Sequence, residues 1–131
     1  MAKTIHSMIR VLQEQRSIEF YHQAFGLAVA ERLDFETFIL IYLSNRESGF
    51  ELELTVNKAR SEPYALGDGY GHLAVSVDDL DAEHRRLAEL GFNPGAVVDF
   101  KHYGKKLARF FFISDPDGYK IEVLQRGGRY L

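Results

Sequence analysis

The 131-residue sequence contains no cysteine. This absence excludes disulfide bonds, zinc sites built on thiolates, iron–sulfur clusters and a cysteine nucleophile. Long apolar runs are missing too, since no stretch approaches the ~18 residues that a membrane-spanning helix needs. The opening segment MAKTIHSMIRVL lacks the long apolar stretch of a signal peptide. We therefore expect a cytoplasmic protein that has no membrane partner.

The sequence also lacks a large excess of charge of either sign. It has 16 Lys and Arg residues against 19 Asp and Glu residues, a formal net charge of −3. This balance argues against nucleic acid or an anionic membrane as the main partner. Hydrophobic residues make up 46% and charged residues 27%, which is typical of a folded protein rather than a disordered one. The length predicts a single domain, 1–131.

Hydrophobic periodicity predicts two helices and several strands. The helices are 16–25, with an apolar stripe of Ile18, Tyr21 and Phe25, and 79–90, with a stripe of Leu80, Leu87 and Leu90. They end at Gly26 and Gly91, and Asp78 or Asp79 can cap the second. Alternation of apolar and polar residues predicts strands over 5–11, 50–57, 72–77 and 119–124. Residues 38–43 and 109–114 are further strands, and loops are expected at 45–49, 58–71 and 115–118.

The two halves of the chain repeat one another. When His6 is aligned with His72, each histidine opens a strand that leads into a helix. Each half then closes with a matching strand, GFELEL at 49–54 and GYKIEV at 118–123. The chain is therefore interpreted as two βαβ-type modules, 1–57 and 70–126, joined by a linker at 58–69. This order of elements predicts an α+β fold.

The repeat also selects between two glutamates. Glu51 and Glu53 project from the same face of their strand, so either could be functional. Glu51 aligns with Lys120 and has no acidic counterpart, whereas Glu53 aligns with Glu122. Glu53 is therefore the better candidate.

One histidine and one glutamate from each half form a candidate metal site, composed of His6, Glu53, His72 and Glu122. Two imidazoles and two carboxylates suit Ni, Co, Zn, Fe or Mn, and the lack of thiolates disfavours a closed structural zinc site. A single histidine on a strand or an exposed glutamate is ordinarily a surface group. The occurrence of both types at equivalent positions in both halves favours the metal site.

Other polar residues could contact a ligand. Arg10 and Asn57 share the polar face of the His6 and Glu53 strands, and an arginine can bind a carboxylate through two hydrogen bonds. The ordinary alternative for Arg10 is a surface salt bridge. The basic segment 101–109 is expected to be a solvated loop, or else a clamp for an anionic ligand.

Five segments carry a family resemblance: HSMIRV at 6–11, RSIEFYHQAFGL at 16–27, ELTVN at 53–57, YGHLAVSVDDL at 70–80 and DPDGYKIEV at 115–123. With these segments the sequence resembles the glyoxalase I (lactoylglutathione lyase) family of the vicinal oxygen chelate superfamily. The resemblance implies paired βαβββ modules whose curved mixed sheet encloses a metal. It places the ligands at His6, Glu53, His72 and Glu122, with Ni or Co favoured over Zn. It also implies a homodimer whose sites are shared between subunits.

The activity that the resemblance implies is that of a lyase. The hemithioacetal of methylglyoxal and glutathione is converted to S-lactoylglutathione through an enediolate. Glu122 is expected to move the proton, with Glu53 as its partner across the metal. Arg10 and Asn57 map onto glutathione-contact positions. The segments 12–17 and 99–109 depart from the pattern of the family.

Two other classes of protein in the superfamily remain as alternatives. The first is a different metalloenzyme, either an epimerase or an extradiol dioxygenase. Epimerases resemble this chain but commonly have Gln at the position of Glu53, and dioxygenases use two histidines and one carboxylate. The second is a metal-free protein that binds small molecules and confers antibiotic resistance. Such proteins lose the metal ligands, whereas all four candidate residues are present here.

Overall fold

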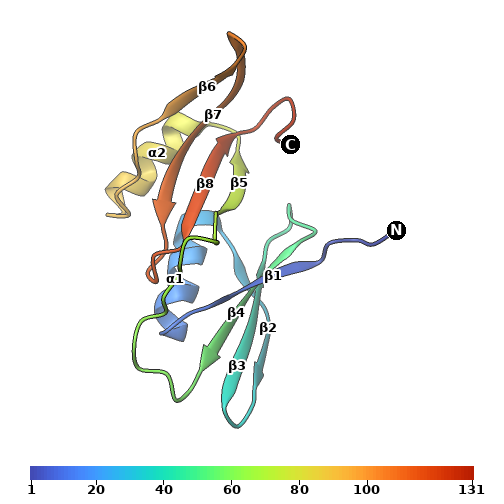
Figure 1. The fold of residues 1–131 in the computed structure, drawn as a ribbon, viewed down its shortest axis with the longest axis vertical. Coiled ribbons are helices and arrows are strands. Elements are labelled where there is room, and N and C mark those ends of the chain that lie inside the picture. The colour runs from blue at the N-terminus through green and yellow to red at the C-terminus, as the bar shows by residue number, and fades with distance from the viewer. The chain divides into compact units, whose positions relative to one another are not determined.

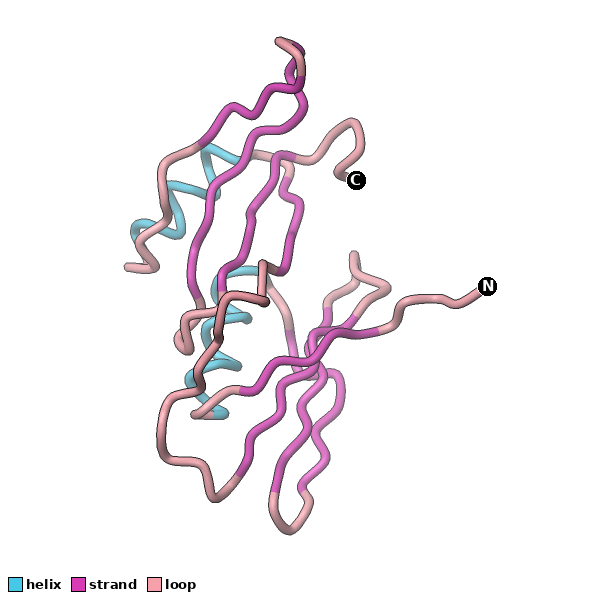
Figure 2. The backbone as a smooth tube through the Cα atoms, in the orientation of Figure 1, coloured by secondary structure: helices cyan, strands magenta, loops and turns pink.

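In the computed structural model, which describes residues 1–131, the chain forms two compact units, Met1–Ala65 and Leu66–Leu131. Each unit contains one helix and one four-stranded mixed sheet (Figure 1, Figure 2). The boundary between the units falls inside the segment 58–69. No helix is both long enough and apolar enough to cross a membrane. The predicted α+β class, with its two βαβββ modules, is confirmed.

The first unit consists of β1 (His6–Arg10), α1 (Glu14–Phe25), β2 (Ala28–Asp34), β3 (Phe38–Ser44) and β4 (Glu51–Asn57). The strand order in its sheet is β1-β4-β3-β2. The outer strand β1 runs parallel to β4, and the other neighbours are antiparallel. Because β1 and β4 are parallel, their connection must cross over, and α1 lies within that crossover.

The second unit repeats this topology. It consists of β5 (Leu73–Val77), α2 (Leu80–Glu89), β6 (Val98–His102), β7 (Lys105–Ser114) and β8 (Lys120–Gln125). Its strand order is β5-β8-β7-β6, with β5 parallel to β8. The registers correspond as well, because Met8 lies opposite Glu53 and Ala74 lies opposite Glu122. The sequence repeat therefore describes two copies of one backbone arrangement.

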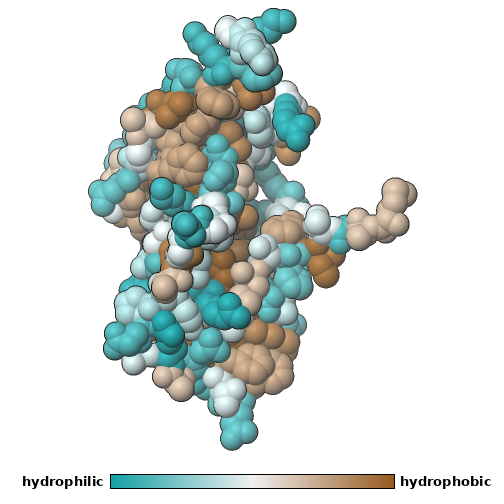
Figure 3. Space-filling model, viewed as in Figure 1, coloured by the Kyte–Doolittle hydropathy of each residue, from teal (hydrophilic) through white to brown (hydrophobic).

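The edge strands β2 and β6 were not predicted from the sequence. Every residue of both strands is exposed, so neither has a buried face that would impose an alternating pattern. Their pairing with β3 and β7 is carried by backbone hydrogen bonds. The expectation of a loop over 101–109 is wrong for the same reason, because these residues belong to the β6–β7 hairpin. Hydrophilic and nearly neutral side chains cover the tip of this hairpin (Figure 3).

Helix α1 ends where the sequence predicts, but it buries a different stripe. Gly26 adopts φ +64°, and its N–H donates to the carbonyls of the last turn. The buried residues are Ser17, Phe20, Tyr21 and Ala24, whereas Ile18 and Phe25 are only partly buried. The predicted stripe consists only of large, mostly apolar residues. The small side chains of Ser17 and Ala24 fit a tightly enclosed face equally well.

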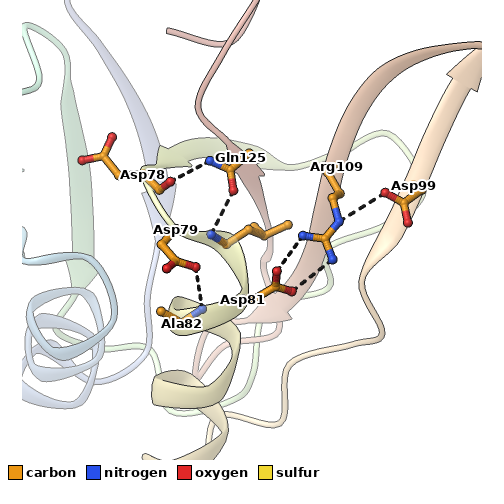
Figure 4. Close-up of polar contacts among 8 residues, drawn as sticks. Asp78, Asp79, Asp81, Ala82, Asp99, Arg109 and Gln125 are labelled. Atoms are coloured by element: carbon orange, nitrogen blue, oxygen red, sulfur yellow. Dashed lines mark hydrogen bonds and ion pairs between the residues drawn. The ribbon is translucent and has the colours of Figure 1, made fainter.

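Helix α2 is fixed at its N-terminus by side chains (Figure 4). The Asp79 carboxylate accepts a hydrogen bond from the N–H of Ala82 at 2.9 Å, which satisfies one of the helix's first N–H groups. Gln125 of β8 accepts from the N–H of Leu80 at 3.1 Å and donates to the carbonyl of Asp78 at 2.7 Å. Of the predicted stripe, Leu80 and Leu87 are fully buried, whereas Leu90 is exposed.

Arg109 connects α2 to the β6–β7 hairpin. Its Nη1 and Nη2 atoms donate to the two oxygens of Asp81 at 2.8 and 3.0 Å (Figure 4). Its Nε atom lies 3.2 Å from Asp99 Oδ1. The Arg109 hydrogen bonds hold the pKa of the Asp81 carboxyl below its ordinary value. This arginine of the basic segment therefore has a structural role, because it links α2 to β6 and β7.

A tight turn at 115–118 sets the start of β8, which carries Glu122. Asp115 is buried, and its Oδ1 atom accepts hydrogen bonds from the N–H groups of Asp117 and Tyr119, both at 2.9 Å. Gly118 adopts φ +94°, a conformation that is strained for any residue with a Cβ atom. The motif DPDG thus acts as a structural element that positions the following strand.

Candidate metal centre

Each unit brings one histidine and one glutamate into contact. In the first unit, His6 Nε2 lies 3.1 Å from Glu53 Oε2. In the second, His72 Nε2 lies 3.0 Å from Glu122 Oε2. Neither unit gathers three or more side chains able to ligate a metal. Each unit therefore supplies one half of the predicted ligand set.

Register explains how these pairs form. Backbone pairing places His6 opposite Glu51, and Glu53 follows two residues later on the same face of β4. The imidazole contacts Glu53, the glutamate that the repeat singles out. His72 lies just before β5, whose first residue Leu73 pairs with Ile121, and it occupies the equivalent place beside Glu122.

In both pairs the histidine is more exposed to solvent than the glutamate. The histidine side chains are 38% and 41% exposed, whereas those of Glu53 and Glu122 are 10% and 16% exposed. A nitrogen and an oxygen about 3 Å apart match neighbouring ligands around an octahedral ion bound at ~2.1 Å. Nitrogen and oxygen donors without thiolates suit Ni, Co or Zn. The residues present therefore fit a divalent transition metal.

An aromatic ring packs against each histidine. His6 meets Tyr42 edge-on at 5.8 Å between ring centroids, and His72 meets Phe112 in the same way at 5.3 Å. The Tyr42 hydroxyl also donates a hydrogen bond to Glu53 Oε1 at 3.2 Å. Burial and the nearby Glu53 carboxylate raise the pKa of the Tyr42 hydroxyl, which therefore stays protonated and available as a donor.

Neither aromatic residue is predicted from the sequence as part of the site. Tyr42 lies opposite Glu53 in the β3–β4 pair, and Phe112 lies opposite Glu122 in the β7–β8 pair. The available signal was the repeat, if it had been extended to the strands at 38–44 and 105–114. That extension requires the strand register, which the structure supplies.

Comparison with known proteins decides the family. A sequence model of the "Glyoxalase/Bleomycin resistance protein/Dioxygenase superfamily" matches residues 3–123. The chain belongs to this superfamily. It is 33% identical over 128 residues to a lactoylglutathione lyase of Neisseria meningitidis, covering 95% of this chain and 91% of that protein.

Solved structures agree with this superfamily assignment. The trypanothione-dependent glyoxalase I of Leishmania major has a TM-score of 0.76 and 29% identity, over 95% of this chain and 87% of that one. Glyoxalase I from Zea mays has a TM-score of 0.77 and 27% identity, over 96% of this chain and 45% of that one.

Two predicted ligand contacts of this superfamily member lie on the first sheet. Arg10 is exposed on β1, on the same face as His6. Asn57 ends β4, and its Nδ2 atom donates to the Tyr64 hydroxyl at 3.0 Å. Tyr64 is in turn covered by the guanidinium of Arg60, 4.4 Å from the ring centroid. The Asn57 side chain is thus oriented by a neighbouring aromatic residue that the sequence analysis did not single out.

Proposed function

We propose that this protein is a glyoxalase I, which converts the hemithioacetal of methylglyoxal and glutathione to S-lactoylglutathione. One observation carries this proposal. Each half of a chain that is 33% identical to a lactoylglutathione lyase holds a His–Glu pair at the same sheet register, with atoms 3.1 and 3.0 Å apart. An epimerase or dioxygenase of the same superfamily is the alternative metalloenzyme, and the retention of both glutamates favours the lyase.

The metal would be held by His6, Glu53, His72 and Glu122. When bound, a Ni, Co or Zn ion supplies Lewis-acid polarisation of the two neighbouring oxygens of the substrate. We infer Ni or Co in preference to Zn from the resemblance to the glyoxalase I family, and the nitrogen and oxygen donors of the site suit all three metals.

The reaction moves one proton between adjacent carbons. Glu122 removes the proton from the carbon that bears sulfur, and that C–H bond breaks. The same carboxylic acid returns the proton to the neighbouring carbon. The hydroxyl of the sulfur-bearing carbon gives up its proton and becomes the thioester carbonyl, while the former carbonyl oxygen gains a proton and becomes a hydroxyl. The Glu122 side chain is only 16% exposed, which limits loss of the proton to solvent. Glu53 is the second carboxylate of the site.

Glutathione would be bound by polar side chains of the first sheet. The Arg10 guanidinium can pair with a glutathione carboxylate, and the Asn57 amide can hydrogen-bond to its peptide groups. One amide hydrogen of Asn57 is donated to Tyr64, which leaves its carbonyl oxygen and its second amide hydrogen for glutathione. We therefore assign Asn57 to hydrogen-bond a peptide group of glutathione.

A complete ligand set requires two His–Glu pairs. We propose that His6 and Glu53 of one chain meet His72 and Glu122 of a second copy in a homodimer. A two-fold axis then generates two equivalent sites. In this arrangement the chain acts as one domain, 1–131, in the cytoplasm.

The test is direct formation of the thioester. Purified protein, loaded with Ni or Co, is mixed with methylglyoxal and glutathione, and S-lactoylglutathione is quantified. The doubly substituted His6→Ala, His72→Ala protein is the control. We expect thioester from the first and none from the second. A metal-loaded protein that forms no thioester would exclude glyoxalase I activity on this substrate. Retention of metal would then point to the epimerase or dioxygenase.

A further inference from the structure

The aromatic rings beside the two His–Glu pairs differ by one hydroxyl group. Tyr42 and Phe112 occupy the same register position, opposite Glu53 and Glu122 respectively. Their rings meet His6 and His72 in similar edge-on arrangements, with interplanar angles of 78° and 75°. The repeat therefore provides an internal comparison of two aromatic rings at one register position, of which only Tyr42 carries a hydroxyl.

That hydroxyl changes how the two carboxylates are engaged. In Glu53, Oε1 accepts from Tyr42 at 3.2 Å and Oε2 contacts His6 at 3.1 Å, so both oxygens are occupied. In Glu122, Oε2 contacts His72 at 3.0 Å, and the neighbouring Phe112 ring has no group to donate to Oε1. Glu53 is also the more enclosed of the two side chains, at 10% exposure against 16%.

We propose that Tyr42 is a positioning residue that dedicates Glu53 to metal ligation, and that Phe112 leaves Glu122 able to take up the substrate proton. This inference rests on the proposed function. A carboxylate must present an oxygen to the proton that it abstracts. Each Glu53 oxygen already has one neighbour, Tyr42 or His6, with which a substrate proton would compete for the oxygen's lone pairs. In Glu122, Oε2 contacts His72, and Phe112 offers no hydrogen-bond donor to Oε1.

The same hydrogen bond restrains the Glu53 rotamer. A carboxylate whose one oxygen accepts a hydrogen bond from a partly buried phenol presents its other oxygen to a metal in a more fixed direction. Loss of such an outer-shell partner typically costs 10–100-fold in metal affinity or activity. Glu122 lacks this restraint and keeps the rotational freedom that shuttling a proton between two carbons requires.

The experiment exchanges the hydroxyl between the halves. Tyr42→Phe gives the first half the chemistry of the second, and Phe112→Tyr does the reverse. A protein with both substitutions swaps the two. These changes alter only a hydroxyl, and circular dichroism verifies that each variant folds.

Co²⁺ affinity is measured by competition with a chelator, and the Co²⁺ absorption spectrum is recorded without substrate. Both readouts are independent of turnover. The kcat and KM of the loaded enzymes follow.

We expect Tyr42→Phe to weaken Co²⁺ binding about 10-fold and to change the Co²⁺ spectrum. Phe112→Tyr should keep the affinity but lower kcat about 10-fold, with KM little changed. In the wild-type background Glu122→Gln should reduce kcat more than Glu53→Gln does. In the swapped protein this order should reverse.

Two results would overturn the proposal. One is wild-type Co²⁺ affinity and spectrum in folded Tyr42→Phe, and the other is wild-type kcat in folded Phe112→Tyr. Failure of the underlying function looks different, because the wild-type protein would then form no thioester at all. In that case the Co²⁺ affinity and spectrum still decide whether Tyr42 positions a ligand.

Discussion

His6 and Glu53 lie on neighbouring parallel strands, two register positions apart, with Nε2 and Oε2 separated by 3.1 Å. His72 and Glu122 repeat this relationship at 3.0 Å. A diagonal contact of this kind depends on the parallel pairing of β1 with β4 and of β5 with β8.

Removal of divalent metal is expected to abolish turnover. The four candidate ligands are nitrogen and oxygen donors, and two of them are partly open to solvent, so a chelator can extract the ion. Thioester formation by metal-depleted protein is measured after adding Ni, Co, Zn or Fe in turn. We expect Ni or Co to restore more activity than Zn. Full activity in rigorously metal-free protein would rule out the proposed chemistry.

Replacement of Glu122 by glutamine is expected to lower kcat by at least ~10²-fold, the usual scale for loss of a general base. The amide keeps the shape and one potential ligand oxygen but cannot accept a proton. Metal content is measured alongside kcat so that loss of the ion is not mistaken for loss of the base. Wild-type kcat in a metal-loaded Glu122→Gln protein would assign the base elsewhere, with Glu53 as the next candidate.

A site shared between subunits predicts complementation between inactive variants. His6→Ala and His72→Ala each damage both sites of their own homodimer. In a mixed dimer, one site carries both lesions and the other carries none. Random pairing makes half of the dimers mixed, so co-refolded variants should recover about a quarter of wild-type activity. Each variant refolded alone is the control. No recovery, once mixed dimers are verified, would reject the shared site.

The two glycines that the repeat aligns are expected to respond differently to alanine. Gly118 has φ +94° and a Cβ there would lie 3.6 Å from Leu66 Cδ1, whereas Gly49 is not in the left-handed region and has open space around it. Gly118→Ala should lower the free energy of unfolding by about 1–2 kcal/mol. Gly49→Ala should be close to neutral. Denaturant titration measures both. Equal effects would show that the backbone strain at 118 is relieved elsewhere.

The Arg109–Asp81 ion pair predicts a pH-dependent contribution to stability. Arg109 lowers the pKa of the Asp81 carboxyl from its ordinary value of 3.8. The contribution is therefore present above that value and is lost as the pH falls through the lower pKa of the folded state. Asp81→Asn should lower Tm slightly at pH 7, and the difference from wild type should vanish in strong acid.

The matched control for this measurement is Asp68→Asn, a change at an exposed aspartate in the loop before β5. It should leave Tm unchanged at both pH values. A difference between Asp81→Asn and wild type that persists undiminished in acid would show that the substitution acts through something other than the charge of the carboxylate.

The sequence by itself determined the repeated modules and one His–Glu pair in each. Both follow from local pattern: period-two alternation defines the central strands, and the match of Glu53 with Glu122 favours Glu53 over Glu51. Helix ends were readable for a similar reason, because Gly26 and Asp79 satisfy backbone groups of their own helices. These features depend on neighbours close in the chain or on direct comparison of its halves.

Tertiary structure alone decided which side chains meet across strands. The edge strands β2 and β6 are set by hydrogen bonds to β3 and β7, and exposed residues leave no hydrophobic signature of such pairing. The contact between Tyr42 and Glu53 depends on the register of an antiparallel pair, which a one-residue slip would abolish. The commitment of Arg109 to Asp81 requires α2 to lie against β7. These contacts join residues that are far apart in the sequence. Strand register and helix packing decide them, and both depend on interactions throughout the unit rather than on neighbouring residues.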